Sequence, residues 1–307
     1  MPTNERVWTR FVRFVSDDGK TYAGEPVDAE IDVGLAVKEG KVVKARVLSS
    51  SSALDEGAKF KGEERPVKQI LAPVTAEQVG SIRCIGVNYN DHGAELGYAV
   101  PPVPIVFIKP NSALNDPSAP IIIPNFVADA DFEVELCVVI GKEARNVTDD
   151  EALDYVLGYC TSNDVAARRA QTITTQFCHG KGFDTFAPVG PTLVHAKAIP
   201  NPQILEMRTT LNGEEMQHTT LDTMIFPVAR IVSHLSQATT IPAGTIIMTG
   251  TPGGIGHSRT PPQYLKEGDD LRLWISGGLG TLTNPIVKDK SSSRFDNGLA
   301  ERNGKAL

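Results

Sequence analysis

The segment from residue 132 to residue 140, FEVELCVVI, places two carboxylates inside an otherwise apolar run. Its valines, isoleucine and phenylalanine favour an extended strand, in which residues two apart share one face and lie ~6.6–7 Å apart. Glu133 and Glu135 therefore lean toward one point on that face. Two buried carboxylates there repel each other and lose hydration unless a cation compensates them. Either the fold supplies that compensation, or the pair lines the wet face of an edge strand.

Much of the remaining chain alternates short apolar runs with turn residues, which indicates strands. The expected strands cover residues 82–89, 103–110, 120–124, 131–141, 244–252 and 269–280. The expected helices cover residues 90–97, 149–159, 164–176 and 226–237. The first helix would begin at Asn90 or Asp91 as its N-cap and end before Gly97. Strands with only a few helices predict a mixed, mainly β fold rather than an alternating βαβ array.

The N-terminal part of the chain predicts a small β-rich unit. Residues 8–48 alternate apolar runs with turn signals, and Asp18-Gly19 and Glu39-Gly40 are expected hairpin turns. Residues 50–69 are polar and contain glycine, which favours a linker. We therefore expect an N-terminal unit with its linker over residues 1–70, a main domain over 71–287, and a polar C-terminal tail over 288–307.

Composition narrows the class of protein. The 307 residues are 41% hydrophobic and 22% charged, as in ordinary globular proteins. A net charge of -7 argues against a nucleic-acid partner. No apolar stretch approaches the ~20 residues of a membrane span, and the N-terminus lacks the apolar core of a secretory signal. The four cysteines show no CxxC spacing, so we expect reduced core thiols in an intracellular protein, cytoplasmic rather than mitochondrial.

A divalent cation would compensate the acidic pair. Carboxylate oxygens suit Mg²⁺ or Mn²⁺, whose remaining positions take water or substrate oxygens. A third carboxylate is then expected close to Glu133 and Glu135. Asp164 is a candidate, because it follows an apolar stretch and precedes an expected helix.

Seven motifs follow one another along the chain: IGVNYNDHGAELG, PPVPIVFIKPNSALNDP, DFEVELCVVIGKEARNV, DYVLGYCTSNDVAARRAQ, KGFDTFAPVGP, LNGEEMQ and IPAGTIIMTGTPGGIG. In this order they resemble the fumarylacetoacetate hydrolase superfamily, in its shorter fumarylacetoacetate-hydrolase-domain-containing branch. The resemblance covers roughly residues 80–287 and implies a β-sandwich roll with a few peripheral helices. It also implies a catalytic role for the 71–287 domain, a homodimer, and Mg²⁺ or Mn²⁺ held by Glu133, Glu135 and Asp164.

His92 and Glu95 are three residues apart, so on a helix they share a face and can hydrogen-bond. Many such pairs are only surface pairs of a helix. The resemblance implies instead that Glu95 orients His92 as the base that activates water.

Four further residues take roles from the resemblance. Lys181 would point at the substrate near the metal and stabilise an oxyanion, and Gln171 could donate to the same oxygen. Arg168 could contact the substrate or pair with a neighbouring carboxylate. Thr251, with backbone N–H groups of the TGTPGGIG loop, would cradle the substrate carboxylate.

The chain also departs from the family pattern. Arg169 stands at a position that is often acidic, Phe177 where Trp is frequent, and Val87 where acylpyruvate-cleaving members tend to carry a basic residue. These changes alter the substrate wall and leave the metal triad intact.

The implied activity is cleavage of a C–C bond in a small 2-oxo or β-diketo acid, by hydrolysis or decarboxylation. Enol–keto tautomerisation of oxaloacetate-like acids is the alternative. A non-catalytic homologue that binds metal and ligand is the hypothesis from another class.

Overall fold

The computed structural model describes residues 6–291, and its centre is the acid-bearing strand β11 (Val134–Ile140). All seven residues of this strand are buried. Val134, Leu136 and Val138 pack into one hydrophobic cluster, whereas Cys137 and Val139 pack into another on the opposite face. Because side chains alternate along a strand, Glu135 faces the same side as Cys137. Truncating a core side chain such as Leu136 to alanine should cost roughly 2–5 kcal/mol.

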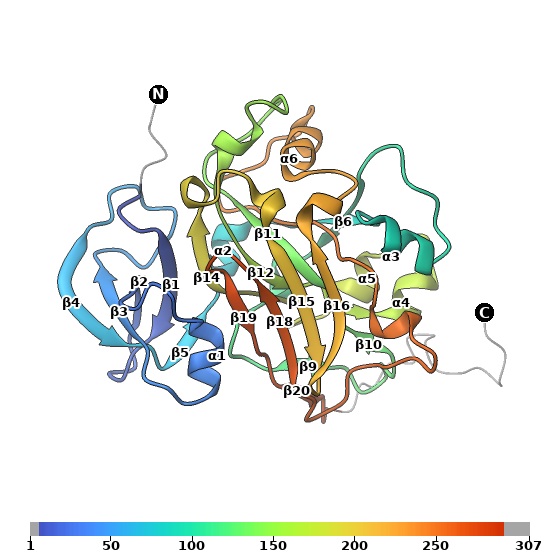
Figure 1. Cartoon of the computed structure of the whole chain (residues 1–307), viewed down its shortest axis with the longest axis horizontal. Coiled ribbons are helices and arrows are strands. Elements are labelled where there is room, and N and C mark those ends of the chain that lie inside the picture. The colour runs from blue at the N-terminus through green and yellow to red at the C-terminus, as the bar shows by residue number, and fades with distance from the viewer. Residues whose placement is uncertain (1–5, 292–307) are drawn as a thin grey trace.

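A large mixed sheet runs through the molecule from left to right in Figure 1. Its strands are, in sheet order, β4 (Phe60–Pro66), β3 (Lys44–Leu48), β2 (Thr21–Pro26), β1 (Arg10–Val15), β14 (Ala187–His195), β12 (Val156–Asn163), β11, β17 (Ile246–Met248), β6 (Ile82–Gly86) and β7 (Ile105–Lys109). Off this path, β5 (Gln69–Leu71) pairs with β1, and β8 (Leu114–Asn115) pairs with β14. All pairs on the path are antiparallel except β17 with β6.

A second, four-stranded sheet lies across β11 and β12 and closes a sandwich (Figure 1). Its order is β16 (Glu214–Thr220), β15 (Glu206–Leu211), β18 (Leu271–Ile275) and β19 (Gly280–Leu282). Two small ladders join β10 (Ala130–Asp131) to β13 (Ala166–Ala167) and β9 (Ile121–Ile123) to β20 (Ile286–Lys288). Met207, Leu273 and Ile275 meet the residues of β11 in one cluster, so the core lies between the sheets.

Helices are short and peripheral. The α-helices are α1 (Val33–Lys38), α2 (Ala76–Val79), α3 (Asn90–Glu95), α4 (Arg168–Thr172), α5 (Cys178–Lys181) and α6 (Val228–Ser236). The 3₁₀ turns are η1 (Asn111–Ala113), η2 (Ala152–Tyr155), η3 (Ala196–Ala198), η4 (Pro202–Ile204), η5 (Leu221–Thr223) and η6 (Gly256–Ser258). Among residues 6–291, no helix is long and apolar enough to cross a membrane. The mixed, mainly β fold is therefore confirmed.

The N-terminal strands continue the large sheet. Strand β1 pairs with β2 through the expected hairpin at Asp18-Gly19, and its Arg10 and Phe11 pair with Val194 and Leu193 of β14. The division of the chain at residue 70 stays a prediction, as does the tail over 288–307, of which residues 292–307 lie outside the described part.

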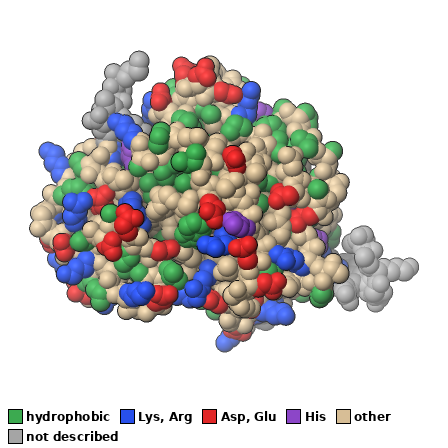
Figure 2. Space-filling view, viewed as in Figure 1, with side chains coloured by type: hydrophobic (Ala, Val, Ile, Leu, Met, Phe, Trp, Pro, Cys, Tyr) green, Lys and Arg blue, Asp and Glu red, His purple; other side chains and the backbone are tan. Residues whose placement is uncertain are grey.

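On the face drawn in Figure 2, positive and negative side chains are interspersed.

Two expectations for the N-terminal unit are wrong. The Glu39-Gly40 pair ends a helix, α1, instead of turning a hairpin, and Asp32 caps that helix by accepting from the Leu35 N–H at 3.0 Å. The expected linker over 50–69 contains a strand, β4, which pairs with β3. A polar composition did not prevent β4 from pairing, because backbone hydrogen bonds to β3 hold it.

Two helix predictions also need correction. The acidic segment at 149–159 forms only the single turn η2, and Val156 and Leu157 belong to strand β12, which is paired on both edges. Helix α3 has Tyr89 as its N-cap, without a side-chain cap, instead of Asn90 or Asp91. Gly97 does follow α3 in the left-handed region, and α6 begins directly after Pro227.

Candidate active site

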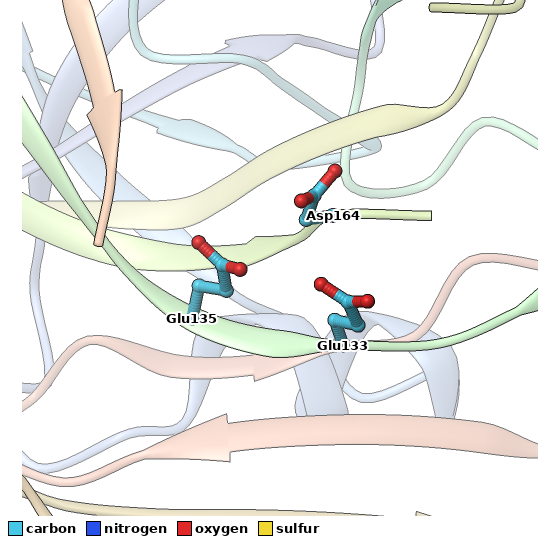
Figure 3. Close-up of side chains that lie close together, drawn as sticks. All are labelled: Glu133, Glu135 and Asp164. Carbon is cyan, nitrogen blue, oxygen red and sulfur yellow. The ribbon is translucent and has the colours of Figure 1, made fainter. Parts of the chain in front are cut away.

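Three carboxylates converge beside β11. Glu133 immediately precedes the strand, Glu135 is its second residue, and Asp164 directly follows β12, which pairs Asn163 with Val134. One oxygen from each of the three lies within 4.8 Å of the others. Figure 3 shows the three side chains close together, with Glu135 on one strand, Glu133 directly before it, and Asp164 at the end of the neighbouring strand. The structure thus brings together the three residues that were predicted as metal ligands.

Three buried cations hold this acidic cluster together. Lys181 Nζ lies 2.7 Å from Glu133 Oε2 and 2.6 Å from Asp164 Oδ2. Arg168 Nη1 lies 2.5 Å from Glu133 Oε1, and Lys109 Nζ lies 2.5 Å from Asp164 Oδ1. Burial alone would raise the pKa of Glu133, but Lys181 and Arg168 outweigh it and hold that pKa well below its ordinary value. Glu133 is therefore ionised at neutral pH.

Glu135 differs from its two neighbours. It accepts a hydrogen bond from the Gly250 N–H at 2.8 Å. Burial, followed by the charges of Asp164 and Glu133, raises its pKa well above the ordinary value. Burial and the two acidic neighbours outweigh Lys181, so the ionised form of Glu135 has a deficit of compensating positive charge. This deficit, next to three converging oxygen donors, fits the binding of a hard divalent cation.

Lys181 reaches the cluster because α5 packs closely on α4. At Gly180, a Cβ atom would lie 2.2 Å from the backbone nitrogen of Gln171, so only glycine permits this approach. Burial opposes the charge on Lys181, but Asp164 and Glu133 raise its pKa above the ordinary value. Lys181 is 3% exposed and carries its positive charge at neutral pH.

His92 and Glu95 form the expected hydrogen bond on α3. His92 Nδ1 lies 2.8 Å from Glu95 Oε1. Glu95 Oε2 also accepts from the Gly254 N–H at 2.9 Å and from the Ser258 hydroxyl at 2.6 Å. Burial opposes ionisation, but the hydrogen bonds from His92, Gly254 and Ser258 lower the pKa of Glu95. An ionised Glu95 keeps the proton of neutral His92 on Nδ1 and leaves Nε2 as a base.

The predicted substrate-binding residues occupy different places. Gln171 and Thr251 line the same pocket as His92 and Lys181. Arg168 is buried and bound to Asp131 and Glu133, with its Nη1 also 3.2 Å from Gln171 Oε1. Its contacts match the alternative in which it pairs with a carboxylate. A substrate contact by Arg168 stays a prediction.

Three residues that support the site were not predicted. Asp131 binds Arg168 and accepts from the backbone N–H groups of Gly256 and His257, both at 2.9 Å. Asp131 could have been found from the sequence, because acids alternate at positions 129, 131, 133 and 135. Lys109 is fully buried and donates to the carbonyls of Val165 and Phe186.

Gln217, the third unpredicted residue, holds Thr251. Its Nε2 donates to Thr251 Oγ1 at 2.7 Å, while its Oε1 accepts from the backbone N–H of Val134 and from the hydroxyl of Thr209. These contacts fix the orientation of the amide. The motif LNGEEMQ contains Gln217, but its sequence position gives no sign of the contact with Thr251.

Comparison with known proteins shows the family. Residues 81–287 match the family model described as fumarylacetoacetate (FAA) hydrolase C-terminal. The chain is 40% identical to a caffeoylpyruvate hydrolase of Neonothopanus nambi, over 92% of this chain and 95% of that protein. It is 39% identical to a mitochondrial oxaloacetate tautomerase of Xenopus laevis, over 80% of this chain and 76% of that protein.

A solved structure agrees with these relatives. The crystal structure of a 2-hydroxyhepta-2,4-diene-1,7-dioate isomerase from Mycobacterium marinum superposes with a TM-score of 0.76 at 33% identity, covering 92% of this chain and 100% of that one. The family match spans both β11 and the residues of the acidic cluster. The chain therefore belongs to the fumarylacetoacetate hydrolase family and is one of its enzymes.

Proposed function

We propose that this enzyme depends on Mg²⁺ or Mn²⁺ and cleaves a C–C bond in a small 2-oxo or β-diketo acid. The bond would break by hydrolysis, as in an acylpyruvate, or by decarboxylation, as in oxaloacetate. The observation that supports this most is the convergence of Glu133, Glu135 and Asp164 within 4.8 Å beside His92 and Lys181. The relatives named above act on acids of these kinds.

The acidic cluster would hold the cation through Glu133, Glu135 and Asp164. A bound Mg²⁺ or Mn²⁺ would supply Lewis-acid stabilisation of negative charge on the oxygens of the keto acid. Lys181 lies at the same place and adds a second positive charge for the oxygen on which charge develops. Lys109 stays bound to Asp164 and the two carbonyls, and so keeps that carboxylate in position.

The dyad would move the protons of hydrolysis. With Nδ1 held by Glu95, His92 Nε2 takes a proton from water, and the hydroxide adds to the distal carbonyl carbon of the acylpyruvate. The bond between that carbon and the adjacent methylene carbon then breaks, and the methylene carbon receives the proton from His92. One acylpyruvate and one water give pyruvate and a carboxylic acid.

Thr251 would bind the substrate carboxylate, and Gln171 would donate to the substrate oxygen that Lys181 stabilises. Thr251 Oγ1 already accepts from Gln217, so its own proton is available to donate. Gln171 Oε1 faces Arg168, so the amide Nε2 is left to donate into the pocket. Arg168 would then act on the substrate through Gln171.

Tautomerisation of an oxaloacetate-like acid is the second candidate, favoured by the similarity to the tautomerase of Xenopus laevis. In that reaction His92 only carries a proton between carbon and oxygen, and no water is consumed. The presence or absence of C–C cleavage products therefore separates the two candidates.

The test uses purified full-length enzyme with acetylpyruvate and oxaloacetate, with Mg²⁺, with Mn²⁺ and with EDTA. Pyruvate formation that requires the added ion supports the proposal. Turnover that persists unchanged after complete metal removal contradicts the metal mechanism. Enol–keto exchange of oxaloacetate without pyruvate formation supports the tautomerase instead.

We also propose a homodimer. Strand β7 is an edge of the large sheet and exposes Ile105, Val106 and Ile108, and the preceding loop exposes Val100 and Val103. Exposed apolar side chains on an unpaired edge strand favour association with another chain. A dimer mass in sedimentation, reduced to a monomer by Ile108→Lys, is the expected result. A monomer mass for the unaltered chain contradicts it.

The proposed location is intracellular, in the cytoplasm rather than in mitochondria. Cys84, Cys137 and Cys160 are buried free thiols, as expected in a reducing compartment. Recovery of the protein with the cytosolic fraction of its own cells tests this location, and recovery with mitochondria contradicts it.

A further inference from the structure

The pocket beside the acidic cluster has a polar end and an apolar wall. The lining at the polar end consists of His92, Glu133, Glu135, Gln171, Lys181 and Thr251, and Ile85 and Tyr98 line the pocket as well. We define the apolar wall as Gly86, Val87, Leu96, Phe107 and Phe177, which line the same pocket. The wall therefore surrounds the part of a substrate that the polar groups do not hold.

Contacts within the wall are close. Phe107 and Phe177 meet edge to face with ring centroids 5.8 Å apart. A Cβ at Gly86 would lie 3.5 Å from Phe177 Cε2, so that ring packs directly over the Gly86 backbone. Lys181 Nζ lies 5.2 Å from the centre of the Phe107 ring, which marks the boundary between the two ends. The wall is thus continuous with the site of chemistry.

Val87 has an unusual backbone. Its φ angle is 52°, in the left-handed region that a β-branched residue rarely adopts. Strain of this kind persists where the surrounding structure imposes it, and it is often found at functional sites. The Val87 side chain is buried, and its Cγ1 would lie 3.2 Å from a Cβ at Gly93, next to His92 on α3. The Val87 side chain therefore packs against α3, the helix that carries His92 and Glu95.

The cations near the pocket have partners at the acidic cluster. Among the lining residues that the structure describes, Lys181 is the only Lys or Arg, and its ammonium contacts Glu133 and Asp164. Arg168 is bound to Asp131 and Glu133, and Lys109 to Asp164. A second carboxylate on the substrate would lie against the wall without a cation, and burial of an unpaired charge is unfavourable.

We propose that the pocket selects dioxo acids whose distal end is an uncharged alkyl or aryl group, and discriminates against dioxo acids that carry a second carboxylate at that distal end. This inference rests on the proposed function, because it assumes that the polar end holds the 2-oxo acid. The wall then buries the apolar end of the acyl group, and a terminal carboxylate at the same place loses hydration without gaining a partner.

A matched pair of substrates tests the inference. Butanoylpyruvate and succinylpyruvate have the same number of carbon atoms and differ in a terminal methyl against a terminal carboxylate. With the Mg²⁺-supplemented full-length enzyme, kcat/KM should be higher for butanoylpyruvate by roughly 10-fold or more. A ratio of one or below overturns the inference while leaving the proposed function intact. Failure to hydrolyse either substrate overturns the acylpyruvate hydrolysis on which this inference rests.

Val87→Arg supplies the missing cation, and it also replaces a β-branched residue in the strained position. We expect this variant to lower the preference for butanoylpyruvate by roughly 10-fold, mainly through KM of succinylpyruvate. Phe177→Arg, at a half-buried position of the same wall, is the second variant should Val87→Arg fold poorly. Val42→Arg is the control, because Val42 is 79% exposed in the N-terminal unit. An unchanged preference in both wall variants contradicts the role of the wall.

Discussion

The polar end and the apolar wall of the pocket are built in different ways. The polar end collects groups from strands and helices that are far apart in the sequence, and hydrogen bonds fix most of them. Glu95 accepts from Gly254 and Ser258, and Thr251 from Gln217. The wall side chains touch by packing alone, and Leu96 and Phe177 are only half-buried. We therefore expect the polar end to determine the reaction and single side chains of the wall to determine the substrate.

The largest effect is expected at the metal ligands. Glu135→Ala should lower kcat/KM by more than about 100-fold. Replacing a residue that only hydrogen-bonds to a metal ligand already lowers metal affinity or activity by about 10–100-fold. Mn²⁺ binding should weaken in parallel. It is measured from the signal of the free ion in electron paramagnetic resonance. Glu214→Ala on the exposed end of β16 is the control. Undiminished Mn²⁺ binding and activity in Glu135→Ala would remove Glu135 from the ligand set.

His92→Ala should separate two reactions of the polar end. Hydrolysis of acetylpyruvate should fall by about 10²–10⁴-fold, because only that reaction requires activated water. Decarboxylation of oxaloacetate should be affected much less. The exposed His218, which pairs with Glu206 on the neighbouring strand, provides the control variant His218→Ala. Equal losses of the two activities would show that His92 does not act by activating water.

Gln217→Leu should have a smaller effect, because Gln217 acts through Thr251. We expect about a 10-fold rise in KM with little change in kcat, since the Thr251 hydroxyl loses its fixed orientation. Thr251→Ala should remove the same interaction. The double variant should therefore be no worse than Thr251→Ala alone. Additive effects of the two changes would mean that Gln217 supports the site by another route.

The smallest effect concerns stability. The pKa of Glu95 lies below its ordinary value of 4.5, so the folded state binds the proton less tightly than the unfolded chain. The ionised carboxylate then stabilises the fold above that ordinary value, and this contribution is lost as the pH falls through the lowered pKa. Glu95→Gln should lower Tm by about 2 °C at pH 7 and by less in acid. Glu267→Gln, at an exposed position, should show no such pH dependence. An equal loss of Tm at both pH values would contradict the charge effect.

The sequence predicted those parts of the site that depend on neighbouring residues. Glu133 and Glu135 share a face because they are two apart at the start of a strand, and His92 and Glu95 meet because they are three apart on a helix. The mainly β fold followed from the alternation of apolar runs and turns. Asp164 was a candidate from its position before an expected helix, the resemblance implied that it is a metal ligand, and the pairing of β12 with β11 places it beside Glu133.

The remaining parts depend on contacts between distant segments. Gln217 and Thr251 are separated by 34 residues, and Lys109 bonds to a carbonyl 56 residues away. No local pattern specifies such pairs.

The prediction of a helix over 149–159 was wrong for a related reason. Its apolar spacing suits a helix, but Val156 and Leu157 are buried at the start of β12, where Val156 pairs with Ile140 of β11 inside the large sheet.

Strand β11 is hydrogen-bonded along both edges, to β12 and to β17. Because this ladder restrains the backbone, we expect Glu135 and the adjoining Glu133 to keep their spacing with substrates of different size. Residues 96–104, which are neither helix nor strand, contribute Leu96 and Tyr98 to the lining. We therefore expect differences in substrate size to be accommodated at this loop rather than at the acids.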